Sequence, residues 1–242
     1  MLPTLSAPPP PPRGSGPASD LTHALAEAVR RWHEQPDEVA LVECVLDDVA
    51  DLLPPHASAA VTLLEHSGGS SPRTAGTSGT AIDLDVLQQR AGQGPAVDAL
   101  DGTIVASADL DHEHRWPLVV PEAVGRGVRS LLCLPLAPGR QVLGVLSVYC
   151  ASAADGARLD RGLLEAVSTH AALAVQRVQQ VVHLTAALVS RDVVGQAKGM
   201  LMERQQFTDE QAFDVLRRAS QRLNRKLRDV ADDIVHRRPL SG

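Results

Sequence analysis

The 242-residue chain is predicted to fold as an α+β domain, followed by a long helix and a small all-α domain. Three observations support this. Helical and extended patterns alternate over residues 20–157, no glycine or proline lies between Gly162 and Gly195, and short amphipathic patterns fill residues 190–242. Hydrophobic residues make up 44% of the chain but aromatic residues only 2%, so the core must be aliphatic.

The first 19 residues are rich in Pro, Gly and Ser, with five consecutive prolines at positions 8–12. This composition buries too little apolar surface to offset the entropy of ordering, which predicts a disordered tail. It also lacks the apolar segment of a secretory signal, and no apolar run in the chain is long enough to span a membrane. The three cysteines are odd in number and far apart, as is typical of a reducing cytoplasm.

The segment from residue 20 to 157 has the elements of a mixed domain. Helical spacing predicts helices at 20–32, 37–54, 82–95 and 116–128, the last one broken by Pro121 or beginning there. Extended patterns predict strands at 58–66, 102–110, 130–136 and 141–150, the last two joined by an APGR turn.

A helix of about 45 residues is predicted to begin near Leu159, spanning about 60 Å. Its apolar residues keep a near-heptad spacing: Leu164, Val167, Ala171, Ala174, Val178, Val181 and Leu188. One small domain cannot cover such a length, so residues 158–189 are interpreted as a parallel coiled coil that makes the protein a homodimer. The alternative is a helix that breaks near His183 and packs back on its own chain.

The C-terminal segment, residues 190–242, resolves into three amphipathic helices. Thr208 and Gln211 form a predicted capping box at the start of the second helix. The predicted core comes from all three helices: Val194, Ala197 and Leu201, then Ala212, Leu216, Ala219 and Leu223, then Leu227, Val230, Ala231 and Ile234.

Positive charge is concentrated at this end of an acidic protein. The chain has a net charge of −6, yet residues 184–242 carry 11 Lys and Arg against 8 Asp and Glu, a net of +3. Six of these cations surround the predicted turn between the second and third helices: Arg217, Arg218, Arg222, Arg225, Lys226 and Arg228. Such a cluster is typical of a polyanion-binding site, although a solvated charged face has the same pattern.

The blocks QAKGMLM, EQAFDVLRRAS and NRKLRDVA, in this order, resemble the ANTAR domain, the three-helix RNA-binding module of bacterial transcription antiterminators. The blocks LDVLQQRAGQGPAVDAL, HRWPLVVPEAVGRGVRSLLCLPL and LGVLSVYC are similar to GAF domains that precede this module in actinobacterial regulators. The resemblance implies a GAF-like antiparallel sheet flanked by helices at 20–157 and an ANTAR-like domain at 190–242.

From this resemblance we expect a regulator that binds paired stem-loops in nascent mRNA leaders and prevents a terminator from forming. The residues that match the module's polar positions are Lys198, Gly199, Arg217, Arg218, Ser220, Asn224, Arg225 and Lys226. Arg217, Arg225 and Lys226 are expected to engage phosphates, Ser220 and Asn224 to offer hydrogen bonds to bases, and Lys198 to contact a phosphate or base. Gly199 would permit close approach of RNA or tight helix packing. Asn224 is favoured as a helix cap, a role that is compatible with base contact.

The resemblance implies a small-molecule ligand for the GAF-like domain, such as a cyclic nucleotide, tetrapyrrole or haem, but the residues do not identify it. His112 and His114 stand two apart in an acidic loop, a weak metal pattern that a solvated loop explains better, so no metal site is expected. No phosphate loop, nucleophile elbow or metal signature is present, so no enzymatic activity is expected. Two alternatives remain open: a helix-turn-helix DNA-binding regulator and a dimeric protein-interaction module.

Overall fold

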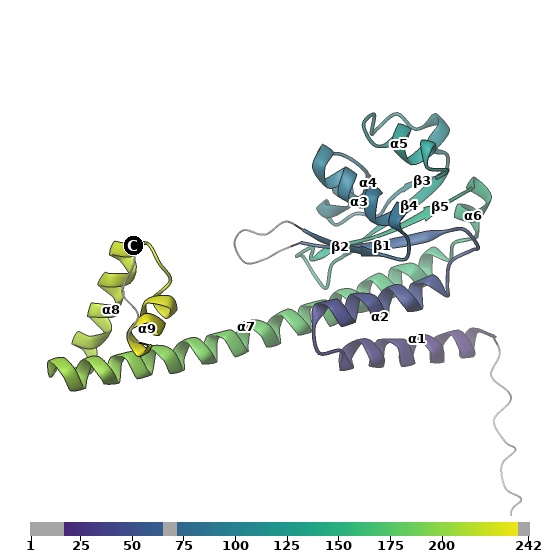
Figure 1. Ribbon diagram of the computed structural model, residues 1–242. Helices are drawn as coiled ribbons and strands as arrows, with labels where there is room; N and C mark the ends of the chain where they lie inside the picture. The colour runs from purple at the N-terminus through teal and green to yellow at the C-terminus, as the bar shows by residue number, and fades with distance from the viewer. Residues whose placement is uncertain (1–16, 65–71, 237–242) are drawn as a thin grey trace, which may run out of the picture. The chain divides into compact units, whose positions relative to one another are not determined.

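The computed structural model describes residues 17–64 and 72–236 and divides into two compact units, Met1–Val178 and Gln179–Gly242 (Figure 1). Each unit is described by itself below. Most of the predicted disordered tail, residues 1–19, lies outside the described residues. Helix α1 (Pro17–Glu34) includes the last three residues of this predicted tail. The helix therefore begins three residues before the predicted start at residue 20.

The N-terminal unit is built on an antiparallel sheet with the strand order β2-β1-β5-β4-β3. Its strands are β1 (Ser58–Leu63), β2 (Arg73–Gly76), β3 (Val105–Ser107), β4 (Ser130–Leu136) and β5 (Gly144–Cys150). The hairpin predicted from the sequence is β4 and β5, the two strands that pair most extensively. Both outer strands are short, and β2 was not predicted because its four residues show no alternation of apolar and polar side chains.

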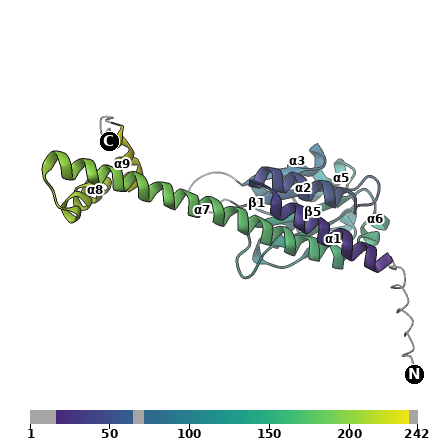
Figure 2. The ribbon, with the colours of Figure 1, turned by 90° about the horizontal axis from the view of Figure 1, so that it is seen from below.

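Each face of the sheet carries its own hydrophobic core, because successive side chains of a strand point to opposite faces. Along β5, Leu146 and Val148 belong to one core, whereas Val145 and Tyr149 belong to the other. Helix α2 (Glu38–Ala50) and the beginning of α7 cover the first face, and α1 packs on the outside of them (Figures 1 and 2). The other face carries α3 (Gly79–Ala91), α4 (Pro95–Asp98) and α5 (Val120–Gly125), the last with Pro121 in its first turn.

Helix α7 (Arg161–Gln205) is continuous for 45 residues, as its lack of glycine and proline predicted. The predicted dimer seam is partly wrong, however. The first five apolar residues of the predicted seam are buried against the sheet and α2 within the same chain: Leu164, Val167, Ala171, Ala174 and Val178. The heptad pattern therefore begins as a core stripe, and only residues from Val181 onward are free to meet a second chain. Within the described ranges, no helix combines the length and apolarity needed to cross a membrane.

The C-terminal unit is a three-helix assembly of the end of α7, α8 (Asp209–Leu223) and α9 (Leu227–Val235). The predicted capping box between Thr208 and Gln211 is confirmed. The predicted core is confirmed as well, because Ala197, Ala212, Leu216, Val230 and Ala231 are all fully buried. The first helix of the unit is the C-terminal part of α7, which continues from the N-terminal unit without a break.

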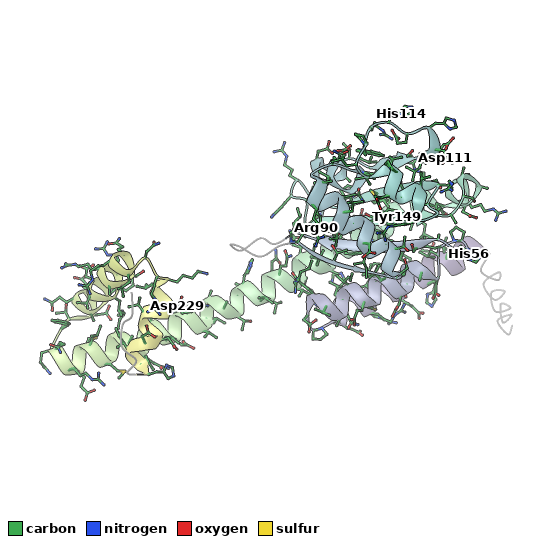
Figure 3. The ribbon with its side chains drawn as sticks, turned by 45° about the horizontal axis from the view of Figure 1, so that its top comes forward. His56, Arg90, Asp111, His114, Tyr149 and Asp229 are labelled. Carbon is green, nitrogen blue, oxygen red and sulfur yellow. The ribbon has the colours of Figure 1, made fainter. Side chains whose placement is uncertain are left out.

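A buried polar network lies between the sheet and α3. The hydroxyl groups of Thr62 and Tyr149 donate to the oxygens of the Asp85 carboxyl group at 2.7 and 2.5 Å. Gln88 donates to the Tyr149 hydroxyl oxygen at 2.7 Å and accepts from the Ala96 amide. Tyr149 lies in the interior of the unit (Figure 3), and Asp85 and Gln88 are at most 1% exposed. The network satisfies each group that burial removes from water.

Replacing Asp85 by Asn tests this network. Burial raises the pKa of Asp85, and hydrogen bonds from Tyr149 and Thr62 oppose the shift only in part. The folded protein then keeps a proton that the unfolded chain has released, so wild-type stability is lost as pH rises above about 4. We expect the unfolding free energy of the wild type to fall relative to Asp85→Asn as the pH rises above about 4. Urea denaturation at a series of pH values measures this; a difference independent of pH contradicts it.

Candidate nucleic-acid interface

The turn between α8 and α9 is set by Asn224, which ends α8 in the left-handed conformation with φ 49° and ψ 41°. Asparagine is one of the few residues that adopt this conformation readily. The Ser220 hydroxyl donates to the Arg225 carbonyl at 2.6 Å, and the Arg225 amide donates to the Ser220 carbonyl at 3.1 Å. Ser220 thus holds the turn together, and its hydroxyl hydrogen is not available to a base. The Asn224 side chain is exposed, so it can be a cap and still offer its amide.

Arg225 was expected to engage phosphate, and the structure places it elsewhere. Its Nη1 atom donates to Asp233 Oδ2 at 2.6 Å, with side-chain exposures of 29% for Arg225 and 10% for Asp233. Asp233 lies on the inner side of α9, where a carboxylate without a counter-charge would be costly. Arg225 therefore ties α9 to the turn rather than facing solvent.

Arg217 and Arg218 share one acidic neighbour on α8. Arg217 Nη2 lies 2.8 Å from Asp214 Oδ1, and Arg218 Nη2 lies 3.9 Å from Asp214 Oδ2. All three side chains are well exposed, and ion pairs of this kind contribute little and exchange partners easily. Both arginines are therefore accessible to a polyanion, with Arg218 the less strongly paired.

Lys198 lies at the opposite end of α8 from the turn. Its Nζ atom pairs with Asp209 Oδ1 at 2.6 Å and stands 5.9 Å from the centre of the Phe213 ring. Because α8 rises about 1.5 Å per residue, Asp209 and Asn224 are separated by roughly 22 Å along its axis. The expectation that Lys198, Arg217, Arg225 and Lys226 gather on one exposed surface is therefore wrong.

Gly199 is exposed, and a Cβ atom built there meets no atom within 4 Å. This excludes tight helix packing within the unit as the reason for the glycine and leaves room for close approach by a ligand.

The cations best placed at the turn are Arg218, Arg222 and Lys226, and these three residues are called the basic turn below. Among the described residues, neither Arg222 nor Lys226 has an ionic partner, and both side chains are exposed. Four residues of chain reach at most about 14 Å, so Arg222, Asn224 and Lys226 lie close together. Arg222 belonged to the basic cluster in the sequence but was not among the expected contact residues.

Phe213 is a second residue that sequence reasoning did not assign to the interface. It is 40% exposed on α8, next to Lys198 and at the border of the buried stripe that contains Ala212 and Leu216. A signal was present, because an aromatic residue just off the apolar stripe of a helix is conspicuous in a chain with so few aromatic residues.

The acidic loop near His112 offers no metal centre. His112 Nδ1 lies 2.7 Å from Asp109 Oδ2, both exposed, and His114 and Asp111 stand on the outer surface of the N-terminal unit (Figure 3). No group of three or more His, Cys, Asp or Glu side chains that could hold a metal ion occurs in residues 17–64 and 72–236.

A groove of about 340 Å³ in the N-terminal unit lies between α2 and strands β1 and β2. Val39, Val42, Val61 and Leu63 line it, and an ion pair between Arg73 and Glu38 borders it. The groove is mainly apolar and could take a small organic ligand.

Comparison with known families assigns both units. The model of the GAF domain matches residues 35–176, more than half of the chain, so the protein belongs to the GAF domain family. The model of the ANTAR domain matches residues 182–235, which include the end of α7, α8 and α9. The GAF match extends into α7, beyond the boundary expected at residue 157, in agreement with the burial of Leu164 to Val178 in the sheet core.

The GAF family match and one solved structure confirm the predicted fold class of the N-terminal unit. The GAF domain of a phosphoenolpyruvate-protein phosphotransferase from Coxiella burnetii matches with a TM-score of 0.50 at 14% identity, over 68% of this chain and 98% of that one. The corresponding domain from Acinetobacter gives a TM-score of 0.49 at 15% identity, with the same coverage. No curated protein matched the chain.

Variants of Asn224 separate its two roles. Asn224→Gly keeps the left-handed cap and removes the amide, so we expect an unchanged melting temperature. Asn224→Val removes both and forces a branched residue into this conformation, at a cost of about 1–2 kcal/mol. If the amide also contacts RNA, both variants bind a hairpin RNA more weakly than wild type. Thermal denaturation and fluorescence anisotropy measure the two effects, and equal melting temperatures for Gly and Val would refute the cap.

Proposed function

We propose that this protein is an RNA-binding transcription antitermination regulator of the actinobacterial GAF–ANTAR type, in which the GAF domain is the sensor. The observation that carries the proposal is the ANTAR match on a three-helix unit whose turn exposes Arg218, Arg222, Asn224 and Lys226. The C-terminal unit would bind paired stem-loops in nascent mRNA and keep a terminator from forming. It works by population shift, because binding one of two exclusive RNA folds depletes the other.

The charges of the C-terminal unit favour RNA loops over the groove of duplex DNA. Helix α9 has nine residues and carries Asp229, Asp232 and Asp233, a poor composition for a recognition helix between phosphate-lined walls. The basic turn is compact instead, with an exposed amide beside two unpaired cations. Recognition of an RNA loop needs phosphate contacts and a few hydrogen bonds to splayed bases, which a turn of this kind can supply.

Two copies of the chain would act together on paired stem-loops. Val181, Leu184 and Leu188 follow one another at helical 3–4 spacing and are 51%, 66% and 63% exposed. An apolar stripe of this kind on a helix is best covered by the same stripe of a second copy, in a parallel coiled coil. A homodimer then presents two basic turns, and binding of the first loop raises the effective concentration of the second.

The sensor would take a small-molecule ligand, for which the apolar groove between α2 and β2 is the candidate place. We propose that the protein has no enzymatic activity. Because it would act on nascent mRNA, we also propose that it works in the cytoplasm. Because α7 is one continuous helix with residues in both cores, a change in the sensor could alter how the two copies of α7 pair. That change would in turn alter the presentation of the two turns.

Binding to a two-hairpin RNA tests the central proposal. A pool of such RNAs with six random nucleotides in each loop is selected on the protein, and the enriched RNA is compared with duplex DNA of equal length. We expect the RNA to be retained and the DNA not. Equal retention of both would favour the DNA-binding alternative, and retention of neither would favour a protein-interaction module.

Salt dependence identifies the contact residues. We expect Arg222→Gln and Lys226→Gln each to reduce the slope of log K against log salt by about 0.7, since each removes one phosphate contact to single-stranded RNA. The matched control is Arg90→Gln, an exposed arginine on α3 of the sensor (Figure 3). An unchanged slope in both turn variants would remove the basic turn from the interface.

The dimer is tested by replacing Leu184 and Leu188 together with Glu. Carboxylates on the apolar stripe repel one another across a seam, so we expect a monomer in sedimentation analysis. Affinity for a single hairpin should persist while the gain from a second hairpin disappears. Ala186→Glu, an exposed position on the opposite side of the helix, is the control and should remain dimeric. A double variant that stays dimeric contradicts the seam.

A further inference from the structure

A hollow of about 520 Å³ opens on the C-terminal unit where α7 passes beside α8. Its lining includes Arg191, Asp192, Gly195, Gln196 and Lys198 on α7 and Phe213 on α8. It is separate from the basic turn, since Asp209, the partner of Lys198, and Asn224 lie at opposite ends of α8.

Gly195 lines the hollow and faces open space. A Cβ atom built on Gly195 meets no atom within 4 Å, so the space above it is open. Glycine is a poor helix former, and nothing in the packing of α7 requires one at this position. Leaving space beside Phe213 is the role that the structure gives it.

The wall of the hollow carries an aromatic ring, Phe213, and two cations, Arg191 and Lys198, beside one carboxylate, Asp192. Phe213 is 40% exposed, and the Lys198 ammonium stands 5.9 Å from the ring centre. The ion pair with Asp209 holds this ammonium in place. An exposed aromatic ring beside a fixed cation is the combination on which proteins stack single-stranded bases while neutralising the adjoining phosphate.

The rim adds polar groups that suit a base and its phosphate. Gln196 is exposed, and its amide can both donate to and accept from a base edge. Arg191 is exposed as well, and it has no ionic partner in the described part of the chain. A buried apolar peptide side chain would gain nothing from these groups, whereas a nucleotide uses all of them.

We propose that this hollow takes one unstacked nucleobase of the bound RNA, stacked on Phe213, with its phosphate near Lys198 and Arg191. The inference rests on the proposed RNA-binding function and deepens it. It gives the C-terminal unit two contact regions, the basic turn for phosphates and the hollow for a single base at the other end of α8.

The experiment combines protein variants with an abasic scan of the selected two-hairpin RNA. Each loop nucleotide is replaced in turn by an abasic one, and affinity is measured by anisotropy for wild type and Phe213→Leu. We expect one loop position whose base removal weakens wild-type binding about tenfold, the range of base–aromatic stacking. With Phe213→Leu the same removal should have no further effect, because the ring and the base act as a pair.

Three further variants sharpen the result. Phe213→Tyr keeps the ring and should retain the dependence on that base. Gly195→Leu fills the hollow without removing a contact and should weaken binding as Phe213→Leu does. Val215→Ala, which shortens another exposed apolar residue of α8 on a different side of the helix, should bind as wild type does.

The outcomes distinguish the inference from the proposed function. If wild type binds the selected RNA but no loop position loses its importance in Phe213→Leu, the nucleobase site is overturned and the RNA-binding function stands. If wild type retains no RNA at all, both fail together. If Gly195→Leu binds as wild type does, the hollow is not the site that a base occupies.

Discussion

The structure depends on one helix that supplies residues to two hydrophobic cores. The first residues of α7 close one face of the sensor sheet through Leu164, Val167 and Ala171, and its last turns supply Ala197 to the three-helix core. Between them the helix carries apolar residues that neither core covers, among them Leu184 and Leu188. Hydrophobic side chains left in water oppose solubility and favour association, so this middle segment is where a second chain gains most by binding.

Formal charge and available charge differ in the C-terminal unit. Lys198, Arg217, Arg218 and Arg225 each have a carboxylate within 4 Å, and Arg225 is held by Asp233 in the last turn of α9. The net positive count of the sequence therefore overstates the field that a polyanion meets. Among the described residues, the cations without an ion pair include Arg222 and Lys226 at one end of α8, and Arg191 beside the hollow at the other.

Hydrophobic periodicity and the residues that begin or end helices and strands were sufficient to predict most elements of the fold. The hairpin of β4 and β5, the length of α7, the capping box at Thr208 and the core of the C-terminal unit were all predictable, because each depends on neighbours in the sequence. Strand β2 was not, since its pairing with β1 depends on tertiary context rather than on its own residues. The heptad residues of α7 were interpreted as a dimer seam because the same spacing serves a coiled coil and an amphipathic core helix.

The candidate site was less predictable than the fold for the same reason. Sequence reasoning found the basic cluster, but it could not tell that Asp233 would face inward and require Arg225, or that Lys198 would stand at the far end of α8. These ion pairs depend on which sides of two helices pack against each other, and the sequence alone does not determine that. Gly199 and Asn224 were each left with two explanations, and the coordinates remove one for Gly199 and show the cap at Asn224.

The short outer strands of the sensor sheet have a consequence for self-association. Strand β2 has four residues and begins with Arg73 directly after Pro72, and β3 has three residues. Edge strands this short offer few free backbone amides and carbonyls. The charged residue and the proline at β2 also disfavour the addition of a strand from a neighbouring chain. Copies of this domain are thereby directed away from edge-to-edge aggregation, and helical surfaces are left as the productive route to assembly.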